Sequence, residues 1–182
     1  MKNLQTCLLA TAVIAMFISA GCKKTDNSTA TTIPNPTTLQ LIFAGSGKPD
    51  TFSYRKVGSI FTTDSIIIQH LASYAVTTVV LDQSVTPAID LTATLGDVNP
   101  RNYIFYEAAT FNATAASGDA LSLTNWDNDD LGFPYRRHFT AAFYANAGAT
   151  GTFQVSLVQG SDKTTGIGGT QLINVTFPFR LL

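Results

Sequence analysis

The sequence predicts an all-β domain, folded as a two-sheet antiparallel β-sandwich with immunoglobulin-like topology and about eight to nine strands. Three observations lead to this fold class. Apolar and polar residues alternate with a period of two in several short runs, which is typical of strands that bury one face. Clusters of Gly, Asn and Asp separate the runs, as in hairpin-rich folds. The chain of 182 residues is 45% hydrophobic and 13% charged, a composition that excludes an intrinsically disordered protein.

Eight runs show the alternation, or the β-branched composition, of strands. In chain order they are 39–43, 52–54, 65–71, 74–81, 89–95, 139–145, 153–157 and 173–181. The last is the clearest, because apolar side chains at alternate positions from Ile173 to Leu181 are separated by polar residues and Pro178. Proline cannot donate to a ladder, so we expect Pro178 at a sheet edge or where no donor is needed. The Ala- and Thr-rich stretch 107–116 is expected to form a long loop with at most one helical turn.

The chain begins with the features of an exported lipoprotein. Lys2 precedes an apolar run, LLATAVIAMFISA at 8–20, which is shorter than the roughly 20 residues of a transmembrane helix. Small residues then lead to Cys22, which resembles the lipobox of bacterial lipoproteins, although Ser19 stands where an aliphatic residue is commoner. We expect residues 1–21 to be removed as a signal peptide and Cys22 to be lipidated. The alternative is an ordinary secretory signal with an incidental cysteine.

Lipidation of Cys22 would hold the protein at a membrane without a spanning segment. Lys23 stands where an Asp would favour retention at an inner membrane, so we expect the outer membrane of a cell envelope, with the periplasmic or surface face left open. Residues 22–37 are polar, Thr-rich and interrupted by prolines, which predicts the lipidated cysteine followed by a disordered tether. Residues 38–182 have the length of one domain.

Charge and motif content favour a non-catalytic protein. The 11 basic and 12 acidic residues nearly balance, so we expect no basic face for nucleic acid. Glu107 is the single Glu, and GxSxG, HExxH and phosphate-binding motifs are missing from the sequence. The first expectation is therefore a binding or structural accessory at the envelope. A hydrolase that combines His70 or His138 with a distant Asp is the alternative class.

The stretch 125–135 is the candidate binding segment. Its residues suited to a ligand are Asn125, Trp126, Asp127, Asp129 and Tyr135. The oxygens of Asn125, Asp127 and Asp129, at alternate positions, resemble the start of a Ca²⁺ loop, and Ca²⁺ is the one cofactor considered. The pattern departs from such loops at Asp130, where Gly is usual, and at Arg136, where Glu is usual.

Two other interpretations of this segment remain. Trp126 beside the neighbouring carboxylates would suit a glycan, which needs an aromatic face and hydrogen-bond acceptors. Phe133 and Tyr135 would either widen this aromatic surface or enter the core. Alternatively, the segment connects two strands, and its Asn and Asp side chains stabilise the turn. The partners considered are therefore a membrane, through Cys22, and a glycan or another envelope protein.

The second half of the chain resembles a group of small Bacteroidetes-type lipoproteins. The matching elements are FY at 105–106, DNDDLGFP at 127–134, GATGTFQVSLV at 148–158, Asp162-Lys163, and a terminal strand from Gly168-Gly169 to VTFP at 175–178. The resemblance covers residues 102–182 and the signal, with departures at 136–138 and an insertion at 108–119. No activity is established for that group, so the resemblance implies fold and location. It also implies that the oxygens of the turn at 127–134 serve the turn itself.

Overall fold

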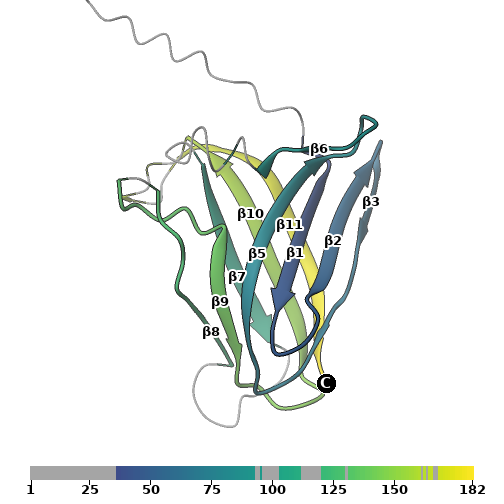
Figure 1. The fold of residues 1–182 in the computed structure, drawn as a ribbon, viewed down its shortest axis with the longest axis vertical. Coiled ribbons are helices and arrows are strands. Elements are labelled where there is room, and N and C mark those ends of the chain that lie inside the picture. Colours follow the sequence, from purple (N-terminus) through teal and green to yellow (C-terminus); the bar gives the residue numbers. More distant parts are fainter. Residues whose placement is uncertain are drawn as a thin grey trace, which may run out of the picture. The chain divides into compact units, whose positions relative to one another are not determined.

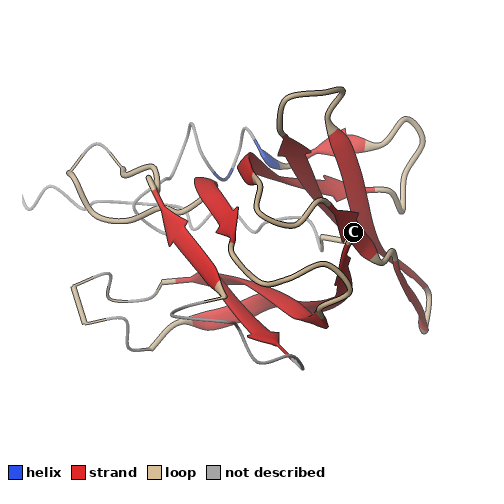
Figure 2. Ribbon diagram, turned by 90° about the horizontal axis from the view of Figure 1, so that it is seen from below, coloured by secondary structure: helices blue, strands red, loops and turns tan. Residues whose placement is uncertain are grey.

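A computed structural model describes residues 36–92, 95, 103–111, 120–129, 131–160, 162, 164–165 and 168–182. The predicted signal peptide, Cys22 and residues 23–35 lie outside this part. The described residues belong to one compact unit, Ile33–Leu182, and form two β-sheets packed face to face (Figures 1 and 2). The predicted all-β sandwich is thereby confirmed. Within the described part, no helix is both long and apolar enough to cross a membrane.

The described residues form more strands than the eight to nine expected. The strands are β1 (Thr38–Ala44), β2 (Asp50–Val57), β3 (Ile60–Thr63), β4 (Ile66–Ile68), β5 (Ser73–Asp82), β6 (Ile89–Asp90), β7 (Tyr103–Phe111), β8 (Leu121–Thr124), β9 (His138–Phe143), β10 (Thr150–Gln159) and β11 (Thr170–Leu181). One sheet has the order β3-β2-β1-β5-β9-β8, with β6 paired to β5, and the other has the order β4-β11-β10-β7. Described neighbours are antiparallel except β4 and β11. The immunoglobulin-like topology stays a prediction.

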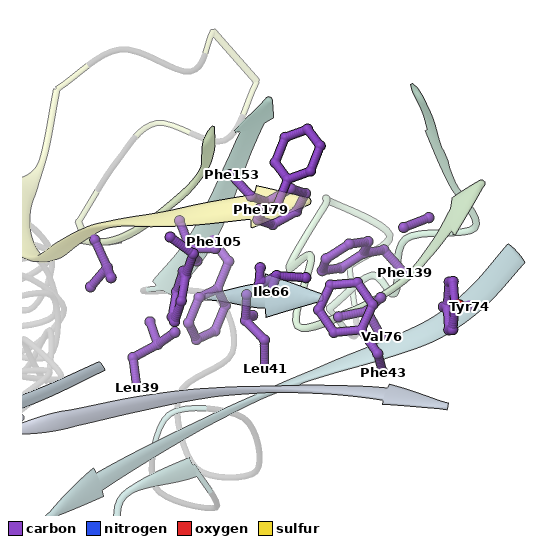
Figure 3. Packing of buried hydrophobic residues seen from close by; sticks show 14 of the residues in the cluster. Leu39, Leu41, Phe43, Ile66, Tyr74, Val76, Phe105, Phe139, Phe153 and Phe179 are labelled. Atoms are coloured by element: carbon purple, nitrogen blue, oxygen red, sulfur yellow. The ribbon is translucent and has the colours of Figure 1, made fainter. Parts of the chain in front are cut away.

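The core lies between the sheets and is rich in aromatic rings. Alternate residues of β10 and β11 are buried, as their period of two predicts. Phe153 of β10 contacts two rings of the opposite sheet, with centroids 6.4 Å from Phe43 and 6.3 Å from Phe139. Figure 3 shows these side chains meeting between the layers. Edge-to-face and offset ring pairs add to the stabilisation by burial, so these contacts join the sheets.

Pro178 lies in β11, whose two sides differ. One side pairs with β10 along the strand, with Pro178 opposite Thr152. On the other side, pairing with β4 begins only at Phe179. Among the described residues, the β11 segment from Thr170 to Pro178 therefore has one open side, and Pro178 stands at its end. This position agrees with the expectation for a residue that cannot donate to a ladder.

Two predicted strands are shorter than expected. Within the run 65–71 only β4 is a strand, because Leu71 has a left-handed backbone (φ 52°) and is exposed. The run 89–95 keeps only β6. After it, the Leu95 N–H donates to the Leu91 carbonyl oxygen (3.0 Å), which closes one helical turn. Leu91 and Leu95 are both buried because residues four apart share one face of a helical turn, whereas Ile89 is exposed.

The expected loop at 107–116 is corrected over its first half. Residues up to Phe111 belong to β7, which pairs with β10 from Gly151↔Phe111 to Gln159↔Tyr103. Residues 112–119 lie outside the described part. A nine-residue ladder outweighs the weak strand propensity of alanine, because tertiary pairing dominates strand formation.

The domain also begins slightly earlier than residue 38. Pro36 and Thr37 are buried. The Thr37 carbonyl oxygen accepts from the Lys56 N–H (2.8 Å), and the Thr37 hydroxyl accepts from the Gln83 N–H (2.7 Å). Thr37 thus ties the start of β1 to both neighbouring strands.

Candidate functional site

The connection between β8 and β9 folds back on itself as a small hairpin. One backbone hydrogen bond joins Asp127 to His138: the Asp127 N–H donates to the His138 carbonyl oxygen (3.0 Å). Asn128 and Pro134 form an antiparallel bridge above it. At the tip, the Asp129 N–H donates to the Phe133 carbonyl oxygen (2.8 Å). Residue 130 lies outside the described part. Backbone hydrogen bonds within the segment 125–138 therefore define its conformation, and we call it the 125–138 hairpin.

Asp129 stabilises the tip of this hairpin. Its side chain is buried, and its Oδ1 accepts the N–H groups of Leu131 (3.0 Å) and Phe133 (2.9 Å). Gly132 completes the turn with a left-handed backbone (φ 84°), and its N–H donates to the Asp129 carbonyl oxygen. The carboxylate thus provides a hydrogen-bond acceptor for two backbone N–H groups that would otherwise need water.

Asp127 stabilises the base of the hairpin. Its carbonyl oxygen accepts the N–H groups of Tyr135 (3.0 Å) and Arg136 (3.2 Å), and its Oδ1 accepts the N–H of His138 (3.0 Å). Asn125 has a left-handed backbone (φ 55°), and its side chain donates to the Thr140 hydroxyl. These polar groups therefore fix the base of the hairpin, as the turn interpretation expects.

The hairpin is also attached to both sheets. The Tyr135 carbonyl oxygen accepts the N–H of Phe105 on β7, and the Arg137 carbonyl oxygen accepts the N–H of Thr78 on β5, each at 3.0 Å. Because β7 and β5 belong to different sheets, the hairpin closes the sandwich on this side. A loop fixed at both sheets presents its exposed side chains with little loss of conformational entropy on binding.

Trp126 presents an exposed ring on the hairpin, and the partly buried Arg136 packs over it. We call these two residues the Trp126 surface. The Trp126 side chain is 36% exposed, and the Arg136 guanidinium carbon lies 4.9 Å from the centroid of its ring. Arg136 has a left-handed backbone (φ 63°), which is rare for a non-glycine residue and costs about 1 kcal/mol or more. Strained backbone of this kind concentrates at functional sites. Phe133 (37% exposed) is a second half-exposed ring on the same hairpin.

Tyr135 does not belong to this exposed surface. It is buried, and its ring meets that of Phe105 edge to face at a centroid distance of 5.8 Å. Of the two roles open to this ring, ligand contact and core packing, the structure places it in the core. The aromatic rings of the hairpin that keep exposed area are therefore those of Trp126 and Phe133.

Glu107 lies below the hairpin, on the inward side of β7. It is two residues from Phe105, which is fully buried, and it pairs with Val155 of the core. Neither carboxyl oxygen has a hydrogen-bond partner in the structure. Burial raises the pKa of Glu107 to about 8; the Arg136 charge opposes this rise and the Asp127 charge adds to it. The carboxyl group is therefore largely protonated at neutral pH.

The proposed Ca²⁺ ligands have separate local partners. The Asn125 amide points to Thr140, one oxygen of Asp127 to the His138 N–H, and one oxygen of Asp129 to the tip of the hairpin. In the described part of the chain, no three His, Cys, Asp or Glu side chains are grouped as metal ligands would be. Calcium binding stays an alternative interpretation of this segment, made from the sequence.

The two histidines make other contacts. The His138 Nδ1 lies 3.0 Å from the Thr77 hydroxyl, and the His70 Nδ1 contacts a main-chain oxygen of Leu182, at the other end of the sandwich. Neither contact joins an imidazole to an Asp side chain, which is the pair that the hydrolase hypothesis requires.

Sequence reasoning identified the hairpin but missed the role of Glu107. A usable signal was present, because Phe105 and Glu107 occupy alternate positions of an otherwise apolar run, YIFYEAATF. An acidic residue at a core-facing position of a strand is unusual enough to mark a buried polar site.

The fold and the hairpin define an all-β sandwich with a candidate binding surface on one loop. No protein-family model matches the chain, and no curated protein or solved structure is significantly similar to it. The resemblance to small lipoproteins therefore stays a prediction, as do the lipid anchor and the location.

Proposed function

We propose that this protein is a lipid-anchored cell-envelope lipoprotein with a non-catalytic binding role, and that the Trp126 surface of the 125–138 hairpin contacts a glycan. One observation carries the second part. A half-exposed tryptophan, stacked with an arginine of strained backbone, is held on a hairpin that is hydrogen-bonded to both sheets. Tryptophan and arginine dominate the energetics of binding surfaces because they combine large contact area with directed polar groups.

The surface also has the chemistry of a carbohydrate site. Trp126 supplies an exposed apolar ring, which suits the C–H face of a pyranose, and Phe133 is a second exposed ring on the same hairpin. Arg136 brings a positive charge over the indole ring, 4.9 Å from its centroid, and this charge attracts acidic groups. Glycans that contain acidic sugars are therefore the preferred ligands within this class.

The test is a titration of the full chain with neutral and acidic oligosaccharides, followed by calorimetry and by thermal melting. We expect an acidic oligosaccharide to raise the melting temperature, and Trp126→Ala to weaken its affinity by about tenfold or more. Tyr144→Ala is the matched control, because Tyr144 is an exposed aromatic residue at the opposite end of β9. A flat response of the wild-type chain to every oligosaccharide would overturn the glycan assignment.

The anchor is tested separately. Cells that express the full chain are supplied with labelled palmitate, and the purified protein is analysed by mass spectrometry. We expect acyl chains on Cys22 and their loss in Cys22→Ser. A mature chain without acyl groups would contradict the lipoprotein assignment whatever the glycan titration gives.

A further inference from the structure

Exposed apolar side chains gather at the tip of the β2–β3 hairpin. Val57, Ile60 and Phe61 are 74%, 69% and 59% exposed, although they flank a turn that polar residues usually occupy. The neighbouring β5–β6 connection adds Val85 and exposed Ile89 at the start of β6. We call these five residues the apolar tip. Val57 pairs with Ile60 across the hairpin and Phe61 follows directly, so these three side chains are neighbours. A group of large exposed apolar side chains marks a contact surface rather than ordinary surface variation.

The apolar tip is held in place. The Phe61 ring stacks on Tyr54 of β2, with centroids 6.0 Å apart and planes at 22°. The Lys56 Nζ lies 5.8 Å from the centroid of the same ring. Burial raises the pKa of Tyr54. The tip thus combines apolar side chains, an aromatic pair and a cation, which is the composition of protein segments that sit at a membrane interface.

The tip lies at the end of the sheet where the chain enters the sandwich. The Lys56 N–H, directly before Val57, donates to the Thr37 carbonyl oxygen, and Thr38 pairs with Arg55 of β2 and with Leu81 of β5. In Figure 1 the start of β1, the β2–β3 turn and β6 are together at the upper end of the molecule. The segment that connects Cys22 to the domain therefore joins it beside the apolar tip.

A cavity separates the two parts of the tip. It has a volume of about 420 Å³ and is lined by Thr37, Lys56, Val57, Gly58, Gln83 and Ser84. The Thr37 and Ser84 hydroxyls of this lining already donate to the Leu81 carbonyl oxygen and to Asp82 Oδ1. Lys56 is therefore the residue of the lining that offers a positive charge to a lipid headgroup.

We propose that the apolar tip rests on the lipid bilayer that carries the anchor, with Val57, Ile60 and Phe61 inserted among the headgroups. This inference rests on the proposed lipidation of Cys22. A flexible chain of the length of residues 23–35 has a root-mean-square span of about 20 Å, so the predicted tether keeps the tip at a high effective concentration at the surface. Weak insertion of a few side chains is then enough to orient the domain.

The test uses the full-length protein, expressed with its own signal and reconstituted into vesicles of phosphatidylethanolamine and phosphatidylglycerol. A polarity-sensitive dye is attached through Ile60→Cys or, as the matched position at the opposite end, through Tyr144→Cys. We expect nitroxide-labelled headgroups to quench the dye at position 60 several-fold more than the dye at position 144. Equal quenching at the two positions would overturn the proposal.

A second pair of variants separates insertion from labelling effects. The dye is moved to Val85→Cys in the background Ile60→Ser/Phe61→Ser, and quenching is expected to fall toward the level at position 144. The matched control is Tyr144→Ser/Leu182→Ser, an aromatic and aliphatic pair at the far end, which should leave the quenching at position 85 unchanged. Thermal melts confirm that the variants fold.

Mass spectrometry of each preparation reports the acyl chains independently. Where these are missing, the lipoprotein assignment fails, and the tip is tested by flotation of the same chain with the vesicles. Flotation that depends on Ile60 and Phe61 supports the proposal, and its absence overturns it. Vesicles of phosphatidylcholine alone show whether the Lys56 charge contributes, because anionic lipid is then removed.

Discussion

Glu107 is a carboxyl group inside a β-sandwich, and its burial couples folding to pH. In the unfolded chain it titrates near 4.5, whereas burial raises its folded pKa to about 8. Between these values the unfolded state releases the proton and the folded state keeps it. The free energy of unfolding therefore decreases as the pH rises, by at most about 1.4 kcal/mol per pH unit from this group. Below pH 4.5 both states are protonated and the contribution is constant.

The prediction is that Glu107→Gln removes this dependence. The amide keeps the shape of the protonated carboxyl and cannot ionise, so the variant should match the wild type near pH 4.5 and exceed it in stability at pH 8. Urea unfolding across this range measures the difference. A difference in stability that does not change with pH would contradict the assignment of a neutral, buried Glu107.

Asp127 and Asp129 lead to a second prediction at this scale. Each uses one carboxylate oxygen to accept backbone N–H groups of its own hairpin, and the two side chains have separate partners. We expect the melting temperature of the full chain to be the same in millimolar Ca²⁺ and in chelator. A bound ion at a hundred times its dissociation constant would add about 2.7 kcal/mol of stability, which a melt detects readily. A clear rise in Ca²⁺ would restore the calcium interpretation.

At the scale of elements, the segment after β6 forms a helical turn, whereas the sequence predicted that the strand continues. A continued strand would place Ile89, Leu91 and Leu95 on one core-facing side, but the structure buries only the two leucines. Leu95→Ala should therefore cost about 2–5 kcal/mol, and Ile89→Ala less than about 0.5 kcal/mol. Chemical denaturation of the two variants measures this, and similar costs at both positions would contradict the helical turn.

The same segment shows why the sequence predicts some elements and misplaces others. Positions four apart satisfy both the period of a strand and that of a helical turn, so Leu91 and Leu95 could not decide between them. β10 and β11 present four or more alternations each, which a helix cannot reproduce, and were predicted with their burial pattern. β7 was missed because alanine, threonine and an acidic residue hide its alternation.

The candidate site likewise has features that the sequence predicts and features that only the folded structure brings together. Trp126, Asp127 and Asp129 are close in sequence, and their turn chemistry is visible there. The stacking of Arg136 on Trp126 depends on the hairpin bond between Asp127 and His138. Glu107 comes from the other sheet, so only the packed sandwich brings it near the base of the hairpin.

At the scale of the whole molecule, the two proposed surfaces share one end of the sandwich. Thr77 pairs with His138, and β5 continues from there to Asp82, so the 125–138 hairpin lies toward the same end as the β5–β6 connection. A glycan bound at Trp126 would accordingly lie near the lipid surface when the apolar tip rests on it. This arrangement favours ligands attached to the membrane or close to it over ligands far out in solution.

The position of β1 has a mechanical consequence. β1 receives the incoming chain and is hydrogen-bonded to β2 on one side and to β5 on the other along nearly its whole length. Tension on that chain acts roughly along the strand axis, so both ladders are loaded in shear and their bonds share the force. An edge strand such as β3, which is paired to β2 on one side, would oppose the same axial pull with a single ladder. With the proposed anchor on Cys22, a pull on a bound ligand would reach the membrane through these two ladders, which share the force.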